Sequence, residues 1–221
     1  MKAGQLSAEQ FAALTALPEV VHGFTTRVAG VDVAHDKAEA LARLDAIHRE
    51  IRISYGLGGA PFVTAQQVHG NRIGVLDKPI ANDECVDGSD GLIANQSGVC
   101  LGIYVADCCA VYLVDPVRKA IGLVHSGKKG TELGIVATAV RSMEKQFGSR
   151  AADLVIQLSP CIRPPHYEID FAADIVRQCR DLGVAEVNDC GVCTACDLNR
   201  YYSYRAEKGR TGRMLALLAL L

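Results

Sequence analysis

Short runs of β-forming residues follow one another closely between residues 62 and 125, separated by Gly, Asn, Asp and Pro. These separating residues end strands and form turns. The runs at 99–105 and 120–124 hardly alternate between apolar and polar residues, which is typical of central strands covered on both faces. This region therefore predicts a sheet with helices on both sides. The expected strands are 62–64, 72–76, 91–94, 99–105, 111–114 and 120–124.

Helical patterns flank this region. Apolar residues recur with a 3.6-residue period over 36–53 and 131–147, and such a period is typical of an amphipathic helix. Further helices are expected at 11–17, 167–182 and 197–207, and further strands at 154–158 and in the apolar run 214–221. The order of elements favours the α/β class, as a single three-layer α/β/α domain around a mixed β-sheet that spans residues 1–221.

Composition excludes several classes of protein. A chain of 221 residues with 49% hydrophobic and 22% charged residues buries a sizeable core, so it is not disordered. A net charge of -2 provides no overall positive field, which argues against a nucleic-acid partner. The longest apolar runs are far shorter than the roughly 18 residues of a membrane span, and no apolar signal segment is visible near the N-terminus. We expect a cytoplasmic protein without a membrane partner.

Three segments place His or Cys at the end of a predicted strand, beside Gly or Asp: QQVHGN at 66–71, VADCCAVYLVDP at 105–116 and AIGLVHSGKKG at 120–130. Because open sheets build their sites at strand ends, His69, Cys108 and His125 are candidates to meet at one site. Their separations are too long for a local metal motif. The alternative is that they are a buried histidine and core cysteines.

These segments resemble the laccase-domain family, also called the multicopper polyphenol oxidase or purine nucleoside phosphorylase family. Several motifs in a fixed order make a chance match improbable, and the resemblance covers nearly the whole chain. Further matching segments are HGFTTRVAGV at 22–31, SDGLIANQSGV at 89–99, PCIRPPHYEID at 160–170 and CTACDLNRYYSYRAEKGRTGRM at 193–214.

The resemblance implies an α/β/α domain with a catalytic metal site, usually zinc, whose ligands are His69, Cys108 and His125. Two imidazoles and one thiolate suit Zn²⁺ and leave a fourth position for water or substrate. Asp107 is expected to orient one of the ligands. The implied reactions are phosphorolysis of purine nucleosides such as adenosine, inosine or methylthioadenosine to the free base and ribose 1-phosphate, and deamination of adenosine.

Phosphorolysis requires groups that hold the attacking phosphate. Arg27 is the first candidate, because a guanidinium can hold two phosphate oxygens, and an exposed surface arginine is the alternative. Lys129 and Arg205 are the second and third candidates. The chain has HSGKKG where the family commonly has HAGWRG, so Lys128 replaces an aromatic residue and Lys129 an arginine. These departures mark a divergent member and affect the choice of substrate more than the metal ligands.

Other chemistries remain open for the same residues. Cys108 with a histidine base would make an amide hydrolase, as in the editing of peptidoglycan precursors to which family members have been linked. A single copper on these ligands would favour phenol oxidation. Six histidines without a His-x-His pair argue against a multicopper centre. The oligomeric state is not predicted.

The cysteines at positions 190, 193 and 196 form a C-x2-C-x2-C run, which would suit a structural metal or an iron–sulfur cluster. The run lacks a neighbouring fourth cysteine followed by proline, and the family resemblance accounts for Cys193 and Thr194 without a cluster. We therefore expect no metal at these cysteines.

Overall fold

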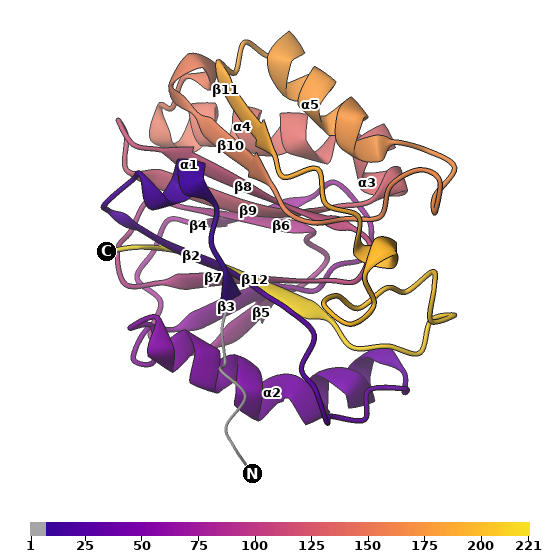
Figure 1. The fold of residues 1–221 in the computed structure, drawn as a ribbon. Coiled ribbons are helices and arrows are strands. Elements are labelled where there is room, and N and C mark those ends of the chain that lie inside the picture. Colours follow the sequence, from indigo (N-terminus) through magenta and orange to yellow (C-terminus); the bar gives the residue numbers. More distant parts are fainter. Residues whose placement is uncertain (1–7) are drawn as a thin grey trace.

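A computed structural model describes residues 8–221 and has the predicted α/β class. Its strands form two six-stranded mixed sheets that pack face to face, with helices on both outer sides (Figure 1). In spatial order, sheet A consists of β1 (Ala8–Glu9), β2 (Val20–Thr25), β12 (Met214–Leu220), β7 (Cys100–Val105), β3 (Phe62–Ala65) and β5 (Glu84–Val86). Sheet B consists of β11 (Glu186–Asp189), β10 (Val155–Leu158), β8 (Cys109–Asp115), β9 (Ala120–Ser126), β6 (Gly91–Ala94) and β4 (Ile73–Leu76).

The structure has two sheets rather than the expected one, and the apolar pattern of the strands explains why the sequence did not reveal the second. In β7, Leu101 and Ile103 pack into the core between the sheets, while Cys100 packs on the opposite side. A strand covered by a helix on one face and by a second sheet on the other is apolar on both faces, as is a strand between two helical layers. The sequence pattern therefore predicts that both faces are covered, but does not distinguish what covers them.

The helices enclose the sheets from both outer sides (Figure 1). Helix α2 (Lys37–Ser54) lies on the outer side of sheet A, and α4 (Ile135–Phe147) and α5 (Phe171–Asp181) lie on that of sheet B. These three match predicted helices. The remaining helical elements are α1 (Ala12–Thr15), α3 (Lys128–Glu132), η1 (Ala151–Asp153) and η2 (Thr194–Cys196). No helix of residues 8–221 combines the length and apolar character needed to cross a membrane.

The helix predicted at 197–207 is wrong, because this segment consists of two turns, at 198–200 and from 204 onwards, joined by residues without regular structure. Its acidic side chains bond to the local backbone instead: Asp197 accepts from the N–H of Asn199 at 3.1 Å, and Glu207 accepts from the N–H of Ser203 at 3.0 Å. Such bonds offer the backbone an alternative to helical pairing. The strand predicted in the C-terminal run is present as β12, in the middle of sheet A between β2 and β7.

Buried His48 makes stability depend on pH. It lies on α2 with 2% exposure, and neither ring nitrogen has a hydrogen-bond partner among the described residues. Burial, and then the charge of Arg52, lowers the pKa of His48 from 6.5 to about 4. The unfolded chain therefore binds an extra proton as the pH falls from about 6.5 towards 4, and stability is lost over that window. At about pH 5 the loss from this residue is about 2 kcal/mol.

Urea unfolding of the wild type and of His48→Leu at about pH 7 and pH 5 measures this loss. The free energy of unfolding of the wild type should fall by about 2 kcal/mol more than that of the variant. Groups that titrate in both proteins cancel in this difference. An equal fall in the two proteins would contradict the assignment to His48.

Candidate functional site

The structure brings His69, Cys108 and His125 together at one end of the two sheets. His69 lies in the loop between β3 and β4, Cys108 in the turn between β7 and β8, and His125 near the end of β9. One ligand atom of each lies within 4.8 Å of those of the other two. The imidazole rings of His69 and His125 are 4.8 Å apart between centroids and nearly perpendicular. This spacing allows all three side chains to bind a single ion.

Asp90, which was not among the predicted site residues, holds the side chain of His125 and the backbone of the loop that carries His69. Its buried carboxylate accepts from Nδ1 of His125 at 2.9 Å, so that Nε2 is the ring nitrogen left for a ligand. The same carboxylate accepts from the backbone N–H groups of Val68, His69 and Gly70 at 3.1, 2.8 and 2.7 Å. Burial raises the pKa of Asp90, but these hydrogen bonds outweigh burial and lower it overall.

The loop that carries His69 depends on this anchor because its backbone is unusual. His69 has a φ of 61°, a left-handed conformation that costs free energy for a residue with a Cβ atom. The bonds from Asp90 to three successive N–H groups hold the loop in that shape. The signal in the sequence is weak, since an acidic residue between Ser and Gly is also typical of a turn.

Cys108 and His125 shift each other's pKa. Burial raises the pKa of the Cys108 thiol, but the charge and hydrogen bonding of His125, and then of His69, lower it overall. Burial likewise lowers the pKa of His125, whereas Cys108 and Asp90 raise it. The surroundings thus favour a thiolate at Cys108, which is the form that binds a metal or acts as a nucleophile.

Gly127 makes room for the thiol. A Cβ atom built at this position would lie 2.5 Å from Sγ of Cys108, closer than van der Waals contact permits. Any larger residue would displace either the strand end after His125 or the thiol itself. The first glycine of the HSGKKG segment is therefore required by the geometry of the site.

A cleft of about 690 Å³ opens over these side chains. Its wall combines basic and aromatic residues, a lining that favours an anionic ligand carrying a flat ring. Among the described residues that line the cleft, Asp107 is the only acidic one. The basic lining residues are Lys37, Lys128, Arg205, Lys208 and Arg213, and the aromatic ones are Tyr104, Tyr167, Phe171 and Tyr204.

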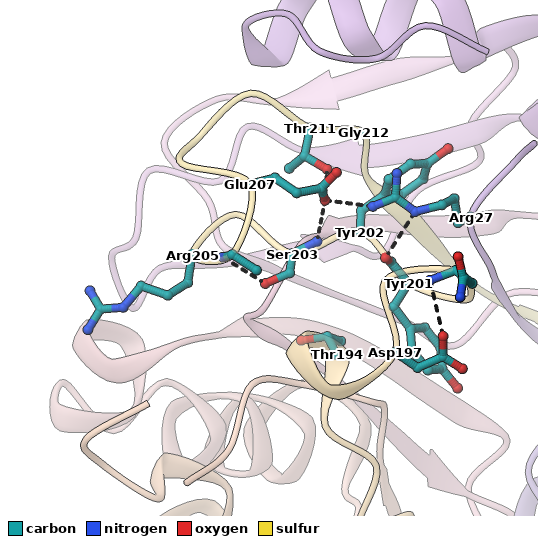
Figure 2. Close-up of polar contacts among 12 residues, drawn as sticks. Arg27, Thr194, Asp197, Tyr201, Tyr202, Ser203, Arg205, Glu207, Thr211 and Gly212 are labelled. Carbon is teal, nitrogen blue, oxygen red and sulfur yellow. Dashed lines mark hydrogen bonds and ion pairs between the residues drawn. The ribbon is translucent and has the colours of Figure 1, made fainter. Parts of the chain in front are cut away.

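The predicted substrate-binding residues are only partly placed in this cleft. Arg27 does not line it. Its guanidinium donates to Glu207 at 2.6 Å and to the carbonyl of Tyr201 at 3.2 Å, and lies 4.5 Å from the ring centre of Tyr202 (Figure 2). Arg27 thus helps to hold the segment after residue 200 in place. Its expected role as a phosphate ligand stays a prediction, which these contacts do not support.

Lys129 is exposed on α3 outside the cleft, whereas the adjacent Lys128 lines it. Consecutive helical residues point in different directions, so the sequence alone did not decide between the two lysines. Arg205 does line the cleft, where it pairs with Glu168 at 2.8 Å and lies 5.3 Å from the ring centre of Tyr167. In Figure 2 its side chain points away from the pair formed by Arg27 and Glu207.

Asp107 is expected to orient one of the metal ligands, but among the described residues its side chain forms no hydrogen bond with His69, Cys108 or His125. Its carboxylate accepts from the hydroxyl of Thr194 and from the backbone N–H of Arg205, both at 2.7 Å. Its φ of 83° lies in the left-handed region, and it directly precedes Cys108. Asp107 therefore joins the turn that carries the thiol to two loops from the C-terminal part of the chain.

Comparison with known proteins places this geometry in a family. The family model described as multi-copper polyphenol oxidoreductase laccase matches residues 21–174 and 169–221. A purine nucleoside phosphorylase of Corynebacterium glutamicum is 28% identical, over 89% of this chain and 93% of its own. The purine nucleoside phosphorylase YlmD of Bacillus subtilis is 26% identical, over 91% of this chain and 89% of its own.

Solved structures show the same fold. The crystal structure of YlmD from Geobacillus stearothermophilus has a TM-score of 0.81 at 23% identity, over 96% of this chain and 98% of its own. The hypothetical protein YfiH of Bacillus licheniformis also has a TM-score of 0.81, at 22% identity, over 91% of this chain and 93% of its own. With a family model matched along nearly its whole length, the chain belongs to the multi-copper polyphenol oxidoreductase laccase family.

Proposed function

We propose that this protein is a zinc-dependent purine nucleoside phosphorylase that acts in the cytoplasm. The observation that carries the proposal is the meeting of two imidazoles and one thiol beneath a cleft lined by basic and aromatic side chains. The relatives from C. glutamicum and B. subtilis that are named purine nucleoside phosphorylase support it. The reducing cytoplasm suits a site that requires a free thiol.

The donor set fits zinc. His69, Cys108 and His125 offer two nitrogens and one sulfur within 4.8 Å of one another, and three protein ligands are typical of catalytic zinc sites, which keep a fourth position open. Asp90 holds His125 in the orientation that presents Nε2. When bound, zinc would supply Lewis acidity towards an oxygen of the substrate or of water. The same donors also accept copper.

The cleft residues suit the two reactants of phosphorolysis. In this reaction a phosphate oxygen forms a bond to C1′ of the ribose while the bond from C1′ to the purine nitrogen breaks, and that nitrogen takes up a proton. Lys128 and Arg213 would hold the phosphate by charge-assisted hydrogen bonds. Tyr167 and Tyr204 provide flat faces for the purine. Deamination of adenosine would use the same purine position, with water as the attacking group.

Phosphate dependence tests the proposal directly. Adenosine, inosine and methylthioadenosine are each assayed with and without inorganic phosphate, after chelation and after zinc is restored. We expect release of free base only when both phosphate and zinc are present. The second product should be ribose 1-phosphate from adenosine or inosine and 5-methylthioribose 1-phosphate from methylthioadenosine. Deamination of adenosine should continue without phosphate. Release of the base at the same rate without phosphate would overturn the phosphorylase assignment.

Lys128→Met tests which residue holds the phosphate. Loss of one charged hydrogen bond of about 1.5–3 kcal/mol predicts a KM for phosphate raised about 10- to 100-fold, with the KM for the nucleoside nearly unchanged. Lys129→Met is the matched control, because it removes the same charge from the adjacent position outside the cleft. If the two variants raise this KM equally, the assignment to Lys128 fails.

The geometry also favours a second candidate, a cysteine amide hydrolase. Cys108, His125 and Asp90 stand in the order nucleophile, base and orienting carboxylate, as in known catalytic triads. This activity would cleave an amide, for example in a peptidoglycan precursor, and would continue after complete chelation. Phosphorolysis would stop under the same treatment, so a single chelation series separates the two candidates.

A further inference from the structure

A second group of metal-binding side chains lies apart from the candidate site. Nδ1 of His166 is 3.4 Å from Sγ of Cys196 and 3.8 Å from Sγ of Cys193. One ligand atom of each of these three residues lies within 4.8 Å of those of the other two, the same closeness as in the first site. None of the three side chains belongs to the set of residues that lines the cleft.

The backbone holds this group in place. Cys193 directly precedes the single 3-10 turn η2 and Cys196 is its last residue, and the N–H of Cys196 donates to the carbonyl of Cys193 at 3.2 Å. On the other loop, the N–H groups of His166 and Tyr167 donate to the carbonyl of Arg163 at 2.9 and 3.1 Å. The three donor atoms are therefore close together because of main-chain geometry, as in a preformed site.

Further backbone bonds join the two loops beside the cluster. Cys161 donates its N–H to the carbonyl of Val192, and its own carbonyl accepts from the N–H of Thr194, both at 3.2 Å. Arg163 also forms an ion pair with Asp189. Since the loops are fixed on both sides of the cluster, a bound ion would not have to bring the donor atoms together.

We propose that His166, Cys193 and Cys196 form a second metal site, which takes a thiophilic divalent cation and above all zinc. Two thiolates and one imidazole are a typical zinc donor set, and a separation of two residues between the cysteines is the usual spacing in such sites. His166 and Cys196 are exposed, so solvent can supply a fourth ligand. This inference does not depend on the proposed function.

The structure also selects two cysteines from the three in the C-x2-C-x2-C run. Cys190 packs against the core between the sheets, whereas Cys193 packs against the core beneath α4 and α5. Cys190 is not part of the cluster. The third ligand, which is not found within the cysteine run, is His166 from a distant segment. The second site therefore revises the expectation that these cysteines bind no metal.

A metal at this position would stabilise one wall of the cleft. Thr194, between the two cysteines, donates its hydroxyl to Asp107 at 2.7 Å, and Asp107 directly precedes Cys108. Tyr167, which follows His166, lines the cleft. The N–H of Ile162 donates to the carbonyl of Asp107 at 2.8 Å. Binding at the second site would thus fix both loops that contact the turn carrying the thiol.

Cobalt titration of the full chain tests the proposal. Metal-free protein, kept reduced with a thiol-free phosphine, is titrated with Co²⁺ while the thiolate-to-cobalt band in the near ultraviolet is followed. We expect about two equivalents in the wild type and about one each in Cys108→Ala and Cys196→Ser. Because this band scales with the number of bound thiolates, it should be about twice as intense in Cys108→Ala as in Cys196→Ser.

Cys190→Ser is the matched control and should keep both equivalents, because it removes the third cysteine of the same run. Circular dichroism verifies that each variant is folded, and exposed Cys196 is a position where serine should not disturb the core. A wild type that binds one equivalent, lost in Cys108→Ala and kept in Cys196→Ser, would overturn the second site. The titration uses no nucleoside, so its result is separate from that of the phosphorylase assay.

Discussion

Cys108→Ala is expected to remove the metal from the candidate site and to reduce kcat/KM for nucleoside phosphorolysis below detection. Two imidazoles remain, and they are too few to hold zinc in a catalytic site with three protein ligands. Loss of a residue that only supports a ligand costs about 10- to 100-fold, so loss of the ligand itself should cost considerably more. Elemental analysis and turnover measured on the same sample provide the two readouts.

Cys109→Ala is the matched control for this experiment. The two thiols are adjacent in sequence, but that of Cys109 is fully buried and lies within hydrogen-bonding range of the carbonyl of Ser159, away from the cleft. This variant should lose some stability through the cavity it creates, while it retains metal and turnover. If Cys108→Ala keeps its metal and full phosphorolysis, the zinc-dependent mechanism with Cys108 as a ligand is wrong.

Asp90→Asn is expected to lower the affinity for zinc by about 10- to 100-fold and to reduce turnover at limiting zinc by a similar factor. The Asp90 carboxylate accepts four hydrogen bonds, from His125 and from three backbone N–H groups. An amide has only one acceptor oxygen. In either orientation its NH₂ group would face donors, so that the His125 ring and the loop of His69 both lose support.

Competition with a zinc chelator measures this change in affinity, and Asp87→Asn is the control. Asp87 is exposed in the turn just before Asp90, so its replacement removes the same charge near the site without changing these hydrogen bonds. Zinc at saturating concentration should restore part of the turnover of Asp90→Asn. Equal zinc affinities in the two variants would contradict the role assigned to Asp90.

The sequence was most informative where a histidine or cysteine lies at the end of an apolar strand. The strands that lead to Cys108 and His125 were predicted close to their observed bounds, so the convergence of these residues followed from sheet geometry. The contribution of Asp90 did not follow, because its hydrogen bonds connect it to a loop about 20 residues away. No local spacing predicts a contact of that kind.

The basic residues show a second reason why sequence patterns did not locate the cleft residues. Arg27 has the right chemistry for phosphate, but Glu207 lies 180 positions away in the chain and occupies its guanidinium. The choice between Lys128 and Lys129 depended on the rotation of a short helix, which no periodicity fixes over five residues. Similarly, a C-x2-C pair was visible in the sequence, but His166 was brought to it only by tertiary structure.

The central position of β12 has a consequence for the order in which the molecule is built. Sheet B is formed by residues 73–189, and this continuous stretch includes Asp90, Cys108 and His125. The two parts of sheet A cannot be joined before β12 is synthesised, because β12 pairs with both β2 and β7. During translation, β8 and β9 beside the thiol can pair while β1 is the only partner available to β2 among the described strands. The three candidate metal ligands are therefore made well before the sheet that completes their surroundings.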